Sequence, residues 1–170
     1  MDIDNTFTVN APIDRVWPVL MDVDAVAGCV PGAQVLGQLS DDEFQVGMKV
    51  RLGPISMQYR GQLSVLERDE ANHRAVLRGS AKETRGQGTA AATVEMRLAE
   101  SEGRTSGTVH ADVRLSGRVA AMGRNVIADV ADQILAQFVR NLEERLGAAD
   151  VGAGRRESAA GAAADHGRSG

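Results

Sequence analysis

Few residues in this 170-residue chain are placed for acid–base, nucleophilic or metal chemistry. The three histidines, His73, His110 and His166, fall in a predicted turn, on the outer side of a predicted strand and near the C-terminus. No Cys-x-x-Cys or His-Glu-x-x-His motif is present, and no Ser-His-Asp arrangement is suggested. The sequence therefore predicts no metal site and no catalytic residues.

The string GQGTAA at residues 86–91 matches the Gly-x-Gly-x-x-Ala form of a dinucleotide-binding loop. Such a loop must open a helix, whereas this string leads into a predicted strand. We therefore interpret it as a hairpin turn.

The stretch Cys29-Val30-Pro31-Gly32 connects a predicted short helix to a strand. A rigid Pro-Gly turn beside a small apolar side chain suits the rim of a ligand cavity, but it also suits a helix end with a buried thiol. Cys29 is the single cysteine, so it forms no internal disulfide, which indicates a reducing compartment. No His or Lys lies near it in the sequence, so a reactive thiolate is not expected.

Several helices and strands must position these residues. The first is predicted to be a strand, because residues 2–10 alternate between apolar and polar side chains. Ala11-Pro12 then opens a short helix, since proline fits the first helical turn, and Pro18 should kink or end that helix. A second short helix is expected at residues 22–29, stopped by Pro31-Gly32.

Period-two alternation returns in residues 43–52, 56–65, 89–98 and 106–115, which is typical of antiparallel strands with one packed face. From Gly117 the apolar residues recur every three or four positions as far as Leu146, which predicts a long amphipathic helix ended by Gly147. The expected fold class is an α+β helix-grip. In it a curved antiparallel sheet of about seven strands wraps a long C-terminal helix, with two short helices after the first strand.

Residues 1–146 are expected to form one helix-grip ligand-binding domain. Residues 147–170 are expected to be a disordered tail, because their Gly, Ala and polar side chains can bury little surface. A net charge of −4 argues against nucleic-acid binding. We expect no signal peptide and no membrane span, since the N-terminus lacks an apolar run and no segment is sufficiently apolar.

The expected inner face of the sheet carries many small residues: Gly61, Ala75, Gly79, Ala81, Ala90, Ala92, Gly107 and Ala111. A long helix over such a surface leaves space unless the sheet curls closely onto it, because protein interiors are otherwise densely packed. We therefore predict a cavity lined by aliphatic and adaptable Met side chains. The candidate ligand-binding residues are Cys29, Pro31, Met48, Met57, Tyr59, Leu77, Met96, Met122, Ile127, Val130, Ile134 and Phe138.

Four stretches carry a resemblance to a known family: VNAPIDRVWPVLMDVDAVAGCVPGAQ at residues 9–34, LGPISMQYRGQLSVLERDEANHRAVL at 52–77, KETRGQGTAAATV at 82–94 and SGRVAAMGRNVIADVADQILAQFVRNL at 116–142. Together they resemble the carbon monoxide dehydrogenase G-subunit family, within the START/Bet v 1-like SRPBCC superfamily. The most specific features are the Cys-x-Pro-Gly-Ala turn and the Gly-Arg-Val-Ala-x-x-Gly helix start.

This resemblance implies an accessory protein of a molybdenum-containing CO dehydrogenase-type oxidoreductase. It also implies a cytoplasmic location with peripheral contact to the inner face of the cytoplasmic membrane. Members of the superfamily hold apolar ligands between sheet and helix, and such an oxidoreductase must pass electrons to the membrane pool. The expected bound molecule is therefore a respiratory quinone, menaquinone or ubiquinone, with no covalently bound cofactor. The tail carries Arg155 and Arg156 but no apolar helix face, so it departs from the membrane-binding element expected there.

Tyr59 is the single polar aromatic residue expected on the inner face. Its ring would flank a quinone ring and its hydroxyl would reach a carbonyl, or it is a core tyrosine bonded to the backbone. Apart from Tyr59, we find no inward His, Asp, Glu or Arg.

The first functional hypothesis is a non-catalytic carrier that shuttles a hydrophobic isoprenoid ligand between the membrane and the oxidoreductase. One alternative is a polyketide cyclase/dehydratase-like enzyme, which needs an ionisable side chain inside the cavity. The other is a structural adaptor that recruits the oxidoreductase to the membrane, which needs an apolar outer patch. The sequence does not define the quinone, the partner's contact surface or the oligomeric state.

Overall fold

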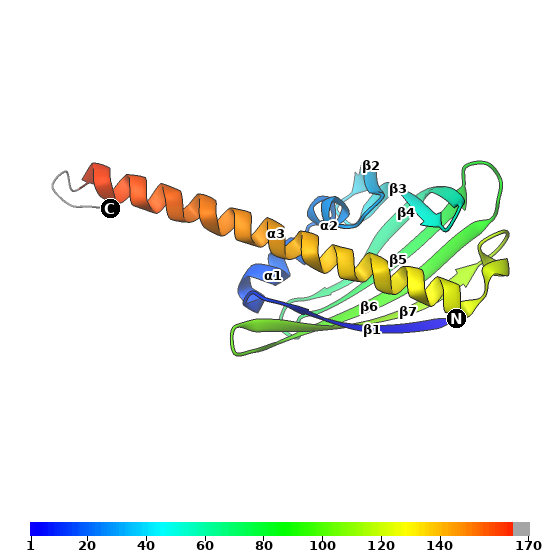
Figure 1. The fold of residues 1–170 in the computed structure, drawn as a ribbon, viewed down its shortest axis with the longest axis horizontal. Helices are drawn as coiled ribbons and strands as arrows, with labels where there is room; N and C mark the ends of the chain where they lie inside the picture. The colour runs from blue at the N-terminus through cyan, green and yellow to red at the C-terminus, as the bar shows by residue number, and fades with distance from the viewer. Residues whose placement is uncertain (165–170) are drawn as a thin grey trace.

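The computed structural model describes the backbone of residues 1–164 and the side chains of residues 1–147. Two short helices follow the first strand, further strands come next, and a 3₁₀ turn precedes the long helix (Figure 1). In chain order the elements are β1 (Asp2–Val9), α1 (Ile13–Leu20), α2 (Val23–Cys29), β2 (Ala33–Ser40), β3 (Glu43–Leu52), β4 (Ile55–Asp69), β5 (Arg74–Glu83), β6 (Thr89–Ser101), β7 (Arg104–Leu115), η1 (Ala120–Met122) and α3 (Arg124–Ala164).

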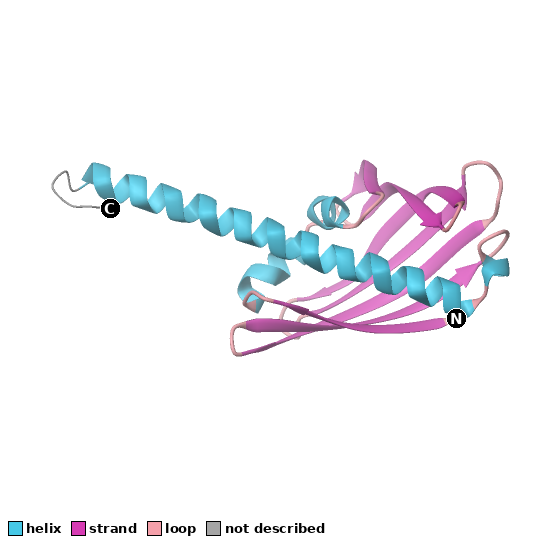
Figure 2. Cartoon of the chain, viewed as in Figure 1, coloured by secondary structure: helices cyan, strands magenta, loops and turns pink. Residues whose placement is uncertain are grey.

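The strands of the described chain form one seven-stranded antiparallel sheet in the order β1-β7-β6-β5-β4-β3-β2. β1 pairs with the last strand, β7, and forms one edge of the sheet, while β2 forms the other. Figure 2 shows α3 lying across one face of the curved sheet. The expected α+β helix-grip is confirmed.

The two short helices are fixed by carboxylates at their first turns. Pro12 precedes α1, and the N–H of Ile13 donates to Oε1 of Glu100 on β6 at 2.7 Å. Asp22 caps α2 by accepting a hydrogen bond from the N–H of Ala25 at 3.2 Å. Both helices lie where the sequence predicts them, and α1 is tied to the sheet.

The long helix begins and ends later than the sequence pattern predicts. Gly123, at a φ of 87°, leads into α3, which starts at Arg124 rather than near Gly117. The expected end at Gly147 is wrong, because α3 continues to Ala164. Gly147 does not adopt the positive φ of a helix C-cap, and the alanine-rich sequence after it favours further helix.

Leu146 is the last buried residue of α3 among those with described side chains, and the helix then runs on past the sheet (Figure 1). The guanidinium of Arg15 donates to the carbonyl of Leu146 at 2.8 Å, which ties this point to α1. The boundary between a domain at 1–146 and a tail at 147–170 stays a prediction, and residues 165–170 lie outside the described residues. Neither α3 nor any other described helix is long and apolar enough to cross a bilayer.

The end of the grip that lies next to α1 and α2 is closely packed. Leu142 on α3 is 0 % exposed, and the ring of Trp17 meets the ring of His73 edge-on with centroids 5.3 Å apart. We call this cluster the packed end: Phe7, Val9, Ala11, Ile13, Val16, Trp17, Leu20, Cys29, Ala75, Leu98, Phe138, Leu142 and Leu146.

Candidate ligand-binding site

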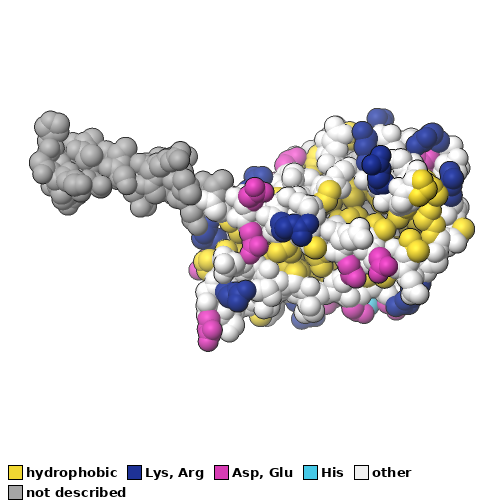
Figure 3. All heavy atoms as spheres, in the orientation of Figure 1, with side chains coloured by type: hydrophobic (Ala, Val, Ile, Leu, Met, Phe, Trp, Pro, Cys, Tyr) yellow, Lys and Arg dark blue, Asp and Glu magenta, His cyan; other side chains and the backbone are white. Residues whose placement is uncertain are grey.

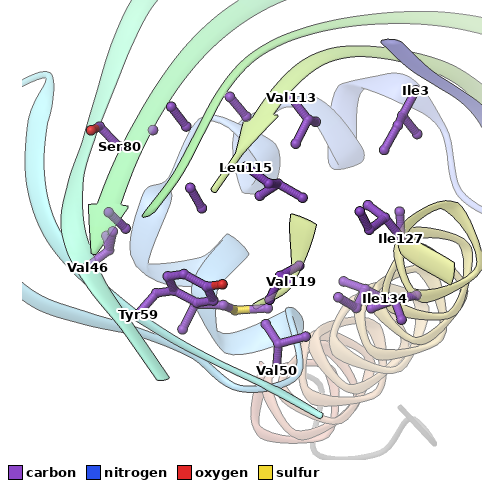
Figure 4. A pocket seen from close by; sticks show the side chains of 18 of the residues that line it. Ile3, Val46, Val50, Tyr59, Ser80, Val113, Leu115, Val119, Ile127 and Ile134 are labelled. Carbon is purple, nitrogen blue, oxygen red and sulfur yellow. The ribbon is translucent and has the colours of Figure 1, made fainter. Parts of the chain in front are cut away.

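An apolar cavity of about 350 Å³ lies at the other end of the grip, between the first turns of α3 and the inner face of the sheet (Figure 4). This volume falls within the range of small-molecule pockets. We call the region the open end. Its lining residues are Ile3, Val46, Met48, Val50, Leu52, Tyr59, Gln62, Gly79, Ser80, Ala81, Ala90, Ala91, Ala92, Val113, Leu115, Val119, Ile127, Val130, Ala131 and Ile134.

Small residues on two neighbouring strands create this space. Gly79 pairs with Ala92 and Ala81 pairs with Ala90 across β5 and β6, and all four residues line the cavity. The cavity predicted from the small inner-face residues is therefore found where such residues coincide on adjacent strands.

Other small residues of the inner face serve close packing instead. Gly107 pairs with Phe7, and a Cβ atom at Gly107 would overlap the Phe7 ring. A Cβ atom at Gly61 would overlap the carbonyl oxygen of Ser80, so Gly61 lets β4 and β5 approach closely. Ala75 is 2 % exposed within the packed end. A small side chain leaves a cavity only where no large group covers it.

Tyr59 is the one ionisable side chain among the described residues that line the cavity. It is 6 % exposed, and its hydroxyl lies on the cavity side of the ring in Figure 4. That hydroxyl has no hydrogen-bond partner within the described residues, so the alternative of a core tyrosine bonded to the backbone is not observed. An unbonded buried hydroxyl costs about 1–3 kcal/mol. The arrangement suits a ligand atom that accepts a hydrogen bond.

A buried carboxylate adjoins Tyr59. Glu83 pairs with Tyr59 across β4 and β5 and is 3 % exposed. Its carboxylate accepts hydrogen bonds from the N–H of Gln58 at 2.9 Å and of Arg85 at 2.6 Å. The bond from Gln58 is the main reason that the pKa of Glu83 lies below its ordinary value. Burial, and then the charge of Glu83, raise the pKa of Tyr59, so its phenol stays protonated and able to donate.

The sequence-based expectation that no inward acid accompanies Tyr59 is wrong for Glu83. This residue continues the inward alternation of Gly79 and Ala81, which is the signal that the sequence offers for it. Its carboxylate is bound to backbone N–H groups and does not line the cavity. Glu83 therefore shapes the cavity wall and the state of Tyr59 without facing a ligand itself.

The predicted site residues divide between the two ends. Met57 and Met122 belong to the apolar cluster that surrounds the cavity, with Met57 2 % exposed. Cys29, Met96 and Phe138 lie in or against the packed end, Leu77 is half-buried on β5, and Pro31 is exposed. The predicted residues that do line the cavity are Met48, Tyr59, Ile127, Val130 and Ile134. Contact of any of these residues with a ligand stays a prediction.

The Cys29–Gly32 turn is held within the packed end. The side-chain amide of Asn141 donates to the carbonyl of Cys29 at 2.9 Å, and the N–H of Lys49 donates to the carbonyl of Gly32 at 2.9 Å. Cys29 is 3 % exposed, and burial raises the pKa of its thiol. The turn fits the interpretation of a helix end with a buried thiol and does not line the cavity.

Several apolar lining residues are absent from the predicted ligand contacts. Val46 and Val50 continue the alternation that includes Met48, so the strand pattern contains them. Ile3 joins the lining because β1 pairs with β7, opposite Ala111. That long-range pairing has no local signal in the sequence.

Comparison with known proteins matches residues 6–147 to the family model of the carbon monoxide dehydrogenase G subunit (CoxG). No curated protein matches the sequence.

Among solved structures, a conserved protein from Geobacillus kaustophilus has a TM-score of 0.78 at 18% identity, covering 86% of this chain and 95% of its own. The Zhui aromatase/cyclase from Streptomyces sp. R1128 has a TM-score of 0.61 at 17% identity, with coverages of 86% and 93%. A START superfamily protein from Mycobacterium smegmatis has a TM-score of 0.57 at 16% identity, with coverages of 86% and 97%. At these identities the structural likeness establishes the fold alone.

Proposed function

The chain belongs to the CoxG family of carbon monoxide dehydrogenase subunits, and we propose that it is a non-catalytic carrier of an isoprenoid quinone, menaquinone or ubiquinone. The carrier shuttles the quinone between the cytoplasmic membrane and a molybdenum-containing CO dehydrogenase-type oxidoreductase. The family name supports an accessory role beside such an enzyme. The observation that carries the proposal is the unpartnered Tyr59 hydroxyl inside an otherwise apolar cavity.

A quinone ring matches the chemistry of this cavity. Its carbonyl oxygen accepts the hydrogen bond that Tyr59 can donate, and its flat apolar faces contact aliphatic side chains such as Val50 and Ile134. The raised pKa of Tyr59 keeps the hydroxyl protonated at neutral pH. The same features disfavour an anionic ligand group at this position, because no described cation lines the cavity.

Apolar burial supplies most of the affinity in this proposal. Each Å² of apolar ligand surface removed from water contributes about 25 cal/mol. A cavity of about 350 Å³ accommodates a ring and the start of a chain, so a long isoprenoid tail extends beyond it. The protein supplies binding, orientation and exclusion of water, and the quinone's electron transfer takes place on the partner enzyme.

Calorimetric titration of delipidated protein tests this proposal. The probe is a soluble short-chain quinone, and the matched control is a carbonyl-free alkylbenzene with the same chain. We expect the quinone to bind about fivefold more tightly, since one hydrogen bond contributes roughly 1 kcal/mol, and we expect Tyr59→Phe to abolish the difference. Equal affinity for the two probes, or binding of neither, would contradict the proposal.

A second candidate is an enzyme related to polyketide cyclases, because a similar fold occurs in the Zhui aromatase/cyclase. Tyr59 would then be its acid or base, since no other ionisable group is found among the described lining residues. Mass spectrometry after incubation distinguishes the two functions. A carrier returns its ligand unchanged in mass, whereas a cyclase or dehydratase returns a product that has lost water.

A further inference from the structure

A group of basic side chains occupies the outer face of three neighbouring strands at the open end. On each strand these residues alternate with cavity residues such as Val50, Tyr59 and Ala81, so they project from the opposite side of the sheet. All are exposed. We call this surface the basic face: Lys49 and Arg51 on β3, Arg60 on β4, and Arg78 and Lys82 on β5.

The basic face is not neutralised by the protein itself. Within residues 1–147, whose side chains are described, no carboxylate forms an ion pair with any of these five residues. Arg60 lies directly opposite Lys82 in the β4–β5 register. Like charges placed opposite each other destabilise a sheet, so folding alone does not account for this pair.

Charge is distributed unevenly between the two ends of the sheet. The chain carries a net charge of −4, and some of its acidic residues lie in the turns at the end opposite the cavity, whereas Asp2, Asp4 and Asp112 lie beside cavity residues on β1 and β7. Those turns contain Asp41, Asp42, Asp69, Glu70 and Glu102. Two of the arginines near that end, unlike those of the basic face, are paired: Arg68 with Asp42, and Arg97 with Glu95. The cations of the basic face therefore favour contact of β3, β4 and β5 with a negative surface.

An exposed apolar side chain accompanies the cations. Leu36 on the edge strand β2 is 41% exposed and, with Arg60 and Lys82, lines a shallow groove on the outer side of the sheet. Figure 3 shows basic side chains gathered over the β2–β4 side of the molecule, next to exposed apolar atoms. Cations beside exposed aliphatic groups are typical of surfaces that lie in the interface of an anionic membrane.

We propose that the basic face docks this protein on membranes that contain anionic lipids, with Leu36 at the lipid interface. The inference rests on the proposed carrier function, because a quinone has to be collected from the bilayer. To that function the inference adds the surface that contacts the membrane and the negative headgroup charge that this surface recognises. Docking by this face sets β3, β4 and β5 against the membrane, with the cavity on the other side of these strands.

Sedimentation with lipid vesicles tests the inference on the full chain. The vesicles consist of phosphatidylcholine alone or of phosphatidylcholine mixed with phosphatidylglycerol. We expect binding to the mixed vesicles that weakens as salt rises, because exposed charges are screened. The triple variant Lys49→Gln, Arg60→Gln, Lys82→Gln should bind roughly 100-fold more weakly, at about fivefold for each cation removed.

A matched triple variant at the other end, Arg68→Gln, Arg97→Gln, Arg104→Gln, changes the net charge equally and should keep wild-type binding. Equal binding of both triple variants, or binding to phosphatidylcholine vesicles as strong as to mixed ones, would overturn the inference. So would a lack of vesicle binding combined with retention on polyglutamate that the Lys49/Arg60/Lys82 variant loses, since the face would then serve an acidic protein.

Quinone content, measured on the same samples after solvent extraction, separates the two proposals. A basic-face variant that contains quinone but fails to bind vesicles supports both proposals. Protein that contains quinone and shows no charge-dependent vesicle binding overturns the docking inference alone. Protein that binds mixed vesicles but never contains or takes up quinone contradicts the carrier function and leaves the docking surface supported.

Discussion

The packed end and the open end are built from the same helix and the same sheet, yet the small inner-face residues have different surroundings at the two ends. At the packed end the Phe7 ring covers Gly107, and Leu142 of α3 is fully buried. At the open end Gly79 and Ala81 pair with Ala92 and Ala90 on the neighbouring strand, and no large side chain covers these four residues. The cavity therefore depends on what faces a small residue as much as on the residue itself.

The largest expected contrast comes from truncating one α3 residue at each end. Leu142→Ala should lower the free energy of unfolding by about 2–5 kcal/mol, because it opens a void in a filled core. Ile134→Ala should cost no more than the lower limit of that range, about 2 kcal/mol, since Ile134 already borders empty space, but it should weaken ligand binding. Urea denaturation and ligand titration measure both quantities. A similar loss of stability at the two positions would break the contrast between the ends.

Adding one methyl group should change the stability of the protein in opposite directions at the two ends. Gly107→Ala should destabilise the protein by about 1–3 kcal/mol, because the new Cβ atom overlaps the Phe7 ring. Gly79→Ala should stabilise it by roughly 0.5–1 kcal/mol, since the nearest atom to a new Cβ there is Leu63 Cδ1 at 3.9 Å. Thermal melts report the sign of each effect. Destabilisation by Gly79→Ala would show that the open end is as tightly packed as the other.

Removing the Tyr59 hydroxyl should separate ligand binding from stability. Tyr59→Phe should make the ligand-free protein more stable than the wild type by up to about 1–3 kcal/mol, because it removes a buried hydroxyl that has no partner within the described residues. Quinone affinity should fall about fivefold, since the lost hydrogen bond contributes about 1 kcal/mol. Thermal melts with and without quinone measure both effects. A ligand-free variant that melts well below the wild type would indicate a structural role for the hydroxyl.

The smallest expected effect is a pH dependence at the open end. Because the pKa of Glu83 is lowered in the folded protein, its stabilising contribution is present above the ordinary value of 4.5 and is lost as the pH falls through the lower folded value. Melting temperature followed across this acidic range should therefore drop more in the wild type than in Glu83→Gln. Parallel curves for the two proteins would contradict a role for the carboxylate.

The sequence predicts the fold and much of the inner face, because both follow from local periodicity. Strand alternation places Met48 and Tyr59 inward, and the helical spacing places Ile127, Val130 and Ile134 on one stripe, in agreement with the cavity lining. The same alternation extends to Glu83 at the end of β5, where an acid is not expected.

Local periodicity does not reveal which end of the grip is hollow. Phe138 continues the stripe of Ile134 but lies in the packed end, because α1 and α2 dock there and deliver Trp17 and Cys29. The pairing of Phe7 with Gly107 joins residues that are far apart in the sequence, so residue size alone does not show that Gly107 is covered. The sequence does not mark the end of α3 either. Gly147, the expected end of the helix, remains helical.

The most direct test of the carrier function is the ligand content of the purified protein. Full-length protein is expressed in a quinone-producing bacterium, extracted with organic solvent and examined by mass spectrometry with ultraviolet detection, alongside the cavity-filling variant Ala92→Leu. We expect an isoprenoid quinone in near-equimolar amount with the wild type and its depletion from the variant. Wild-type protein that carries no quinone and takes up none when it is added would contradict the carrier function.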